Sequence, residues 1–103
     1  MPNVSLHTIA PRLARARDGW LAERHAISVE RRRLNEVELH KRWLVDHRDL
    51  QLQRAQAAPG VSVGKRRSWI AARQRKLAEA RDELADVLAA QAALDDRERR
   101  LSL

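Results

Sequence analysis

The basic residues in the middle of this 103-residue chain are the side chains best suited to bind a ligand. Between residues 41 and 81, eleven Lys and Arg residues stand against three Asp and Glu residues, a local balance of +8, while the whole chain carries +7. Such a concentration of positive charge attracts phosphate backbones or an acidic protein surface. We therefore expect a contact with a polyanion or an acidic partner through Lys41, Arg42, Arg48, Arg54, Lys65, Arg66, Arg67, Arg73, Arg75 and Lys76.

The same cluster allows other interpretations. If nucleic acid is the ligand, we expect salt-sensitive binding to phosphates, because the sequence has no helix-turn-helix spacing and no zinc knuckle. Trp69, beside Lys65-Arg66-Arg67, is the aromatic residue that could stack on a base. Alternatively, the arginines solvate a long helix and form ion pairs four residues apart. The sequence leaves all three open.

A second candidate contact lies on the segment before the cluster. Five residues follow one another at intervals of four, three, four and three, which places them on one face of a helix: Glu36, His40, Trp43, His47 and Leu50. A Trp flanked by Leu and two His indicates a protein-contact patch, since Trp is enriched at binding hot spots. The alternative is that Trp43 folds down and covers the helix–helix seam.

Metal binding and catalysis find little support in the sequence. His40 and His47 are about 10 Å apart along a helix, too far to share a metal ion. Glu36 and His40 supply two ligands where a site needs at least a third. The chain has no cysteine, no nucleophile with a paired base and no phosphate-cradling glycine loop. We expect no enzymatic activity, no metal, no cofactor and no small-molecule substrate.

The composition indicates long helices in one small domain. The chain is 44% hydrophobic but only 3% aromatic, and 34% of its residues are charged, a mixture typical of coiled-coil helices. Residues 1–6 lack the basic and apolar segments of a signal peptide, and no run approaches the roughly 20 apolar residues of a membrane span. We expect a soluble, cytoplasmic protein with no membrane contact.

Two segments carry heptad repeats that would position these side chains. In the C-terminal segment the a positions are Ile70, Leu77, Leu84 and Gln91, and the d positions are Ala80, Val87, Leu94 and Leu101. In the N-terminal segment the repeat is Leu13, Trp20, Ile27 and Leu34, joined by Val37 and Leu44. Each repeat is the pattern of a helix that packs along another helix.

One strong turn signal separates the two segments. Pro59-Gly60 is followed by a serine and a second glycine, so Ser62 or Gly64 starts the next helix. We expect a loose tail over 1–7, a helix over 8–57 with Thr8 as its N-cap and Pro11 in its first turn, a turn over 58–64 and a helix over 65–101. Asp18-Gly19 could instead end a short first helix.

If the helices fold back at Gly60-Val61, residues that face each other have numbers that sum to 121. This register matches five apolar pairs and defines the predicted seam as Trp20, Ile27, Leu34, Val37, Leu44, Leu77, Leu84, Val87, Leu94 and Leu101. Four polar mismatches fall on the same register: Arg73 with Arg48, Ala80 with Lys41, Gln91 with Glu30, and Ile70 with Gln51. The seam thus becomes polar toward the turn.

These patterns predict an all-α fold, an antiparallel two-helix coiled-coil hairpin that self-associates or docks on a partner, because two helices alone bury little surface. They favour a non-enzymatic interaction protein, such as a small assembly subunit, adaptor or inhibitor, that docks on a larger partner through its basic turn end and the Trp43 face. The alternatives are a nucleic-acid-associated protein that binds phosphates at the same end, and a rod-like element of a secretion or virion assembly.

Overall fold

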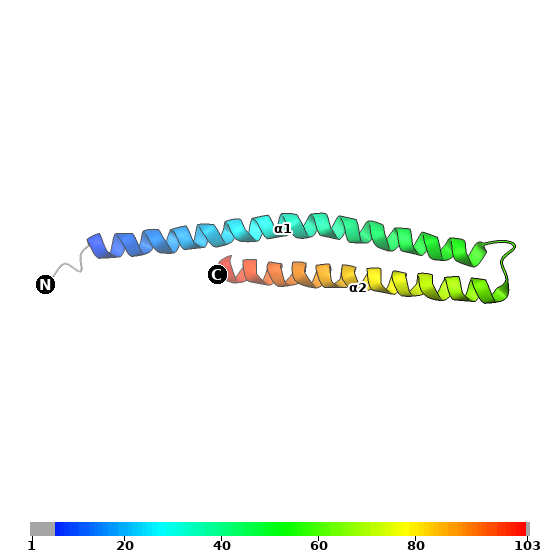
Figure 1. Ribbon diagram of the computed structural model, residues 1–103. Helices are drawn as coiled ribbons and strands as arrows, with labels where there is room; N and C mark the ends of the chain where they lie inside the picture. The colour runs from blue at the N-terminus through cyan, green and yellow to red at the C-terminus, as the bar shows by residue number, and fades with distance from the viewer. Residues whose placement is uncertain (1–5, 103) are drawn as a thin grey trace.

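Two long helices fold back on each other in the computed structural model, which describes residues 6–102. Helix α1 spans Leu6–Ala57 and helix α2 spans Val63–Ser102. They run antiparallel and side by side in a rod with extents of 93 × 16 × 15 Å (Figure 1). The predicted all-α hairpin is confirmed. Helix α1 is the longer, and Figure 1 shows its N-terminal part projecting beyond the end of α2.

Helix α1 begins two residues earlier than expected and continues without a break. Thr8 therefore lies inside the helix and is not its N-cap, and Pro11 lies beyond the first turn. At that position its missing N–H leaves one helical hydrogen bond unmade. Of the predicted tail, residues 1–5 lie outside the described residues, whereas the last two belong to the helix. Asp18-Gly19 does not end a first helix, because α1 runs through it.

The turn follows the Pro-Gly signal closely. Gly60 has a φ of 71°, a left-handed conformation that L side chains adopt at a cost. Ser62 is the N-cap of α2: its hydroxyl accepts a hydrogen bond from the Lys65 amide at 3.3 Å, and its carbonyl accepts one from the Arg66 amide at 3.0 Å. Gly64 is consequently a helical residue, and α2 begins two residues before the predicted start.

The hydrophobic core is a thin line along the seam. Its buried members are Ile27, Leu34, Ala55, Leu77, Ala80, Val87 and Leu94. Ile27, Leu34 and Leu94 form one cluster, against which Leu101 packs. Beyond them Trp20 donates a hydrogen bond from its indole nitrogen to the Leu101 carbonyl at 3.1 Å and stacks under the Arg24 guanidinium. The core is tightest at the end away from the turn.

The predicted register describes some of the contacts across the seam. Ile27 with Leu94 and Trp20 with Leu101 are pairs whose numbers sum to 121, and both are confirmed. Leu94 also joins Leu34 to the cluster, a pair whose numbers sum to 128. This second diagonal exists because each seam side chain of an antiparallel pair packs between two residues of the opposite helix.

Two residues of the predicted polar mismatches find polar partners on the opposite helix. The Gln91 amide nitrogen donates to the side chains of Asn35, at 3.2 Å, and Glu38, at 2.8 Å. The Lys41 ammonium group bonds Glu83 at 2.9 Å. Long polar side chains can extend along the seam and form hydrogen bonds with residues beside the one that faces them. The register alone therefore does not predict their partners.

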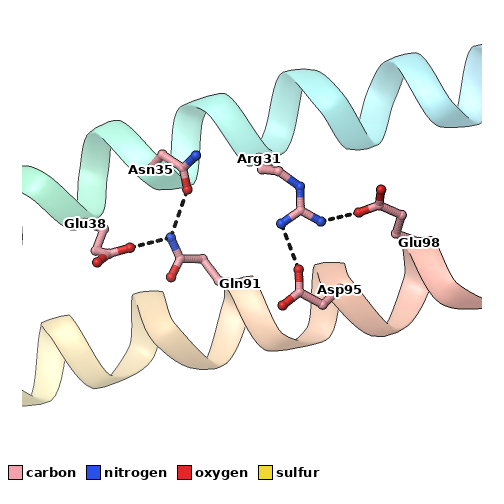
Figure 2. A network of polar contacts seen from close by, with 6 residues as sticks. All are labelled: Arg31, Asn35, Glu38, Gln91, Asp95 and Glu98. Atoms are coloured by element: carbon pink, nitrogen blue, oxygen red, sulfur yellow. Dashed lines mark hydrogen bonds and ion pairs between the residues drawn. The ribbon is translucent and has the colours of Figure 1, made fainter.

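A polar network crosses the seam beside this core (Figure 2). Arg31 reaches from α1 to Asp95, at 2.7 Å, and to Glu98, and these two carboxylates raise the pKa of its guanidinium. Glu38 accepts hydrogen bonds from Arg42 at 2.6 Å and from Gln91, and these bonds lower the pKa of its carboxyl, the bond from Arg42 contributing most. The network fixes the relative position of the two helices.

We expect Leu34→Ala to destabilise the hairpin by about 2–3 kcal/mol, because it removes buried methyl groups from the tightest part of the seam. Urea denaturation followed by circular dichroism measures the change. Leu39→Ala is the matched control on the same helix, since Leu39 is 71% exposed and its truncation costs less than about 0.5 kcal/mol. Equal losses in the two variants would contradict this assignment of the core.

We expect the melting temperature to fall as the pH drops from about 5 to 3. The lowered pKa of Glu38 means that its ionised form stabilises the fold above the ordinary value of 4.5, and that this contribution is lost as the pH falls through the lower folded value. Glu38→Gln should flatten part of this fall. Glu36→Gln, an exposed carboxylate with no ion pair among residues 6–102, should leave the profile unchanged. A Glu38→Gln profile superimposable on that of the parent chain would refute the expectation.

Candidate docking surface at the turn

Ion pairs divide the hairpin into two unequal halves. The described residues form nine ion pairs, and both members of every pair lie in residues 17–42 or 83–100. Four of them cross between the helices, as in the pair of Arg97 with Glu23. Residues 43–82, which include the turn, contribute no ion pair. We call them the turn half, and the remaining described residues the distal half. The positive charge of the distal half is thus largely compensated, whereas that of the turn half is not.

The ten predicted cations fall into two groups. Four are engaged inside the molecule: Lys41 pairs with Glu83, Arg42 pairs with Glu38, Arg48 donates to the Gln51 side chain at 3.0 Å, and Arg66 donates to the Ala58 carbonyl. Within the described range the other six have no acidic partner: Arg54, Lys65, Arg67, Arg73, Arg75 and Lys76. All six lie in the turn half, and all except the half-buried Arg73 are exposed.

Arg66 is structural rather than available for a ligand. Its guanidinium reaches back from the first turn of α2 to the carbonyl of Ala58, just after α1 ends, and so fastens the turn. Its Nε is buried and has no hydrogen-bond partner in the part of the chain that is described. Because its guanidinium is used within the turn, we do not include Arg66 in the docking surface.

A groove of about 310 Å³ lies between the two helices beside the turn. Buried Ala55 and half-buried Ala58 are its small apolar lining residues, and the half-exposed ring of Trp69 stands at its side. Arg54 and Arg73 line it as well, together with Gln51. This arrangement suits an apolar side chain that enters the groove next to a carboxylate that meets a guanidinium.

Sequence reasoning found the cations and Trp69 but missed the floor of this groove. Ala55 occupies an a position of the heptad repeat, where a large residue ordinarily fills the seam. A small residue at that position, opposite a helix that carries Trp69, was the available signal. The groove exists because alanine leaves the space open.

The predicted Trp43 face is present as a stack along α1. The Trp43 ring lies between His47, with ring centroids 4.8 Å apart and an interplanar angle of 9°, and His40, at 6.2 Å and 19°. Trp43 is 57% exposed, so it packs on its own helix and does not cover the seam. Glu36 and Leu50 are exposed on the same face.

Metal binding and membrane insertion are two other roles that helices of this kind can have. Across residues 6–102 no three His, Asp or Glu side chains come together in a way that could hold a metal ion. Neither helix, within its described bounds, contains a stretch long and apolar enough to cross a membrane.

Comparison with known proteins does not indicate a function. No protein-family model, curated protein sequence or solved structure matches this chain.

We expect Trp43→Ala to change the free energy of unfolding by less than about 1 kcal/mol, because its ring contacts two histidines of its own helix and not the seam. Trp20→Ala, which removes the indole bonded to the end of α2, should cost more. Thermal denaturation of both variants makes the comparison. A larger loss for Trp43→Ala would mean that this ring covers the seam after all.

Proposed function

We propose that this hairpin is a non-enzymatic interaction protein, of the adaptor or assembly-subunit kind, that docks through its turn end on an acidic surface of a larger protein. The observation that carries the proposal is the division of charge: all nine ion pairs lie in the distal half, while none of the nine Lys and Arg residues between 43 and 82 has an acidic partner among the described residues. An acidic partner would supply the missing carboxylates.

The groove beside the turn favours a protein over a nucleic acid as the partner. The surface inside it is mainly apolar, with Trp69 at one side and Ala55 and Ala58 beside it. A phosphodiester backbone has no apolar side chain to place there, whereas an acidic protein segment offers both apolar and carboxylate groups. Arg54 and Arg73 at the same groove would bind those carboxylates in a partly desolvated setting, where charge pairs are stronger than in bulk water.

The Trp43 face adds a second area that a large partner can cover. Its ring is exposed and held in one orientation by the flanking histidines, so little conformational entropy is lost on contact. His47 is seven residues before Arg54, which places both on the same side of α1. One partner can therefore reach the groove and this face together.

Charge neutralisation tests the proposal. We expect the triple variant Arg54→Gln, Arg73→Gln and Lys76→Gln to lose affinity for a polyglutamate peptide about tenfold at low salt, since three charge contacts at about 0.5 kcal/mol each sum to about 1.5 kcal/mol. Fluorescence anisotropy of a labelled peptide measures the affinity. The binding should weaken with added salt.

The control variant removes the same net charge elsewhere. Arg12→Gln, Arg15→Gln and Arg32→Gln change exposed cations outside the turn half and should alter the affinity less than about twofold. Equal losses in the two triple variants would show a net-charge effect and reject a docking surface at the turn. Tighter binding of random duplex DNA than of polyglutamate, lost in the turn variant, would replace the proposal with nucleic-acid binding.

A further inference from the structure

Three grooves between the helices repeat at heptad intervals. The turn groove is lined by Ala55 of α1 and Arg73 of α2. A second groove is lined by Arg48 and Ala80, each seven residues farther from the turn. A third, fourteen residues farther still on both helices, is lined by Leu34 and Leu94. We call them the turn, middle and distal grooves; one heptad of helix spans about 10.5 Å.

The three grooves open on the same side of the rod. Each also includes the α2 residue that lies four positions before its seam residue, namely Trp69 in the turn groove, Lys76 in the middle groove and Ala90 in the distal groove. These three residues are seven and fourteen apart, so they occupy one heptad position and one shoulder of α2. The grooves are therefore successive segments of a single trough along one flank.

An ion pair lies between the middle and distal grooves. The corresponding α2 shoulder residue there is Glu83, and it bonds Lys41 across the seam at 2.9 Å. No ion pair of the described residues lies between the turn and middle grooves, which occupy two adjacent heptads.

The opposite flank is crossed by polar side chains. The bonds of Arg31 with Asp95 and Glu98, and of Gln91 with Glu38, run between the helices on that side (Figure 2). A groove exists there near the end of α2, where Arg24 and Leu101 line it, but no heptad series follows it. The two flanks of the hairpin thus differ: grooves at heptad intervals lie on one flank, although the pairs of Lys41 with Glu83 and of Arg97 with Glu23 also cross it.

We propose that the hollowed flank binds one amphipathic helix of an acidic partner protein, with apolar side chains seven residues apart in the turn and middle grooves and carboxylates beside them on Arg54, Arg73 and Lys76. This inference rests on the proposed function and names the form of the partner. A helix is the element whose side chains recur every seven residues on one face. It would complete a three-helix packing around a hairpin whose own core is a single thin line.

Charge selects an acidic helix rather than a second copy of this chain. Arg48, Arg54, Arg73 and Lys76 line the two grooves. Glu79 and Glu83 line the middle groove too, and Glu83 is paired with Lys41. Two copies that met symmetrically through this flank would bring these cations against one another, at a cost that an acidic helix avoids.

Two designed peptides and polyglutamate test the inference. One peptide is an acidic helix with Leu at every seventh position, and the other has the same composition with its leucines at five-residue intervals. We expect the heptad peptide to bind about fivefold more tightly, because burial of an apolar side chain contributes on the order of 1 kcal/mol. Trp69→Ala should abolish this preference and leave polyglutamate binding unchanged. Leu88→Ala, a change to another partly exposed side chain of α2, should preserve it.

Crosslinking locates the bound helix, since the natural chain has no cysteine. Ala58→Cys, in the turn groove, should form a disulfide with a heptad peptide that carries one cysteine at the end near the turn, whereas exposed Ala85→Cys, which lines none of the three grooves, should not. Light scattering of the peptide-free chain tests self-association. A dimer joined through Ala58→Cys would mean that a second copy covers this flank and would overturn the inference.

The outcomes separate the inference from the proposed function. Equal affinity for the two peptides, or crosslinking at Ala85→Cys, overturns the inference, while polyglutamate binding that depends on Arg54, Arg73 and Lys76 still supports docking at the turn. Loss of both peptide and polyglutamate binding overturns the two together. Thermal denaturation of each variant confirms that a lost interaction is not a lost fold.

Discussion

With only two helices, the hairpin has one seam in which to bury apolar surface, and everything else in the molecule depends on how that seam is filled. At one end the seam holds large aliphatic side chains, and Leu94 of α2 packs with both Ile27 and Leu34 of α1. Toward the turn the same heptad positions carry alanine, glutamine and arginine, although Ala55 and Ala80 are themselves buried. Grooves between the helices occur at both ends, and those of the turn half are lined by cations that have no acidic partner in the described structure.

Electrostatics reinforces this division along the rod. The distal half is also the half where carboxylates pair with cations, both within each helix and across the seam, as Arg31 does (Figure 2). Such exposed pairs contribute little free energy individually, but together they hold the helices in register. In the turn half, Arg66 and Ser62 fasten the turn through backbone groups, which leaves the neighbouring cations without an acidic partner in the described structure.

A surface with these properties is incomplete by itself. Small residues leave grooves, cations at the grooves lack counter-charges, and an exposed Trp43 lies held between two histidines nearby. An acidic amphipathic helix would satisfy the grooves and the charges at once. A phosphate backbone would satisfy the charges alone, which is why the grooves carry the argument for a protein partner.

The sequence by itself determined the two helices, their antiparallel arrangement and the location of the positive charge. These properties are local: heptad spacing fixes which face of each helix is buried, Pro59-Gly60 and Ser62 fix the turn, and charge can be counted. The start of α1 was not predicted correctly, because Thr8 has the chemistry of an N-cap although the helix already begins at Leu6.

Only the tertiary structure decided the contacts between the helices. A side chain in an antiparallel seam has two opposite neighbours, and the choice between them depends on the length of the side chain and on the partner within reach, as Gln91 and Lys41 show. The grooves also depend on how the side chains of the two helices pack against each other. Ala55 and Ala80 become gaps only when a facing helix fails to fill them, and the flank on which the gaps open is a property of the pair of helices rather than of either sequence segment.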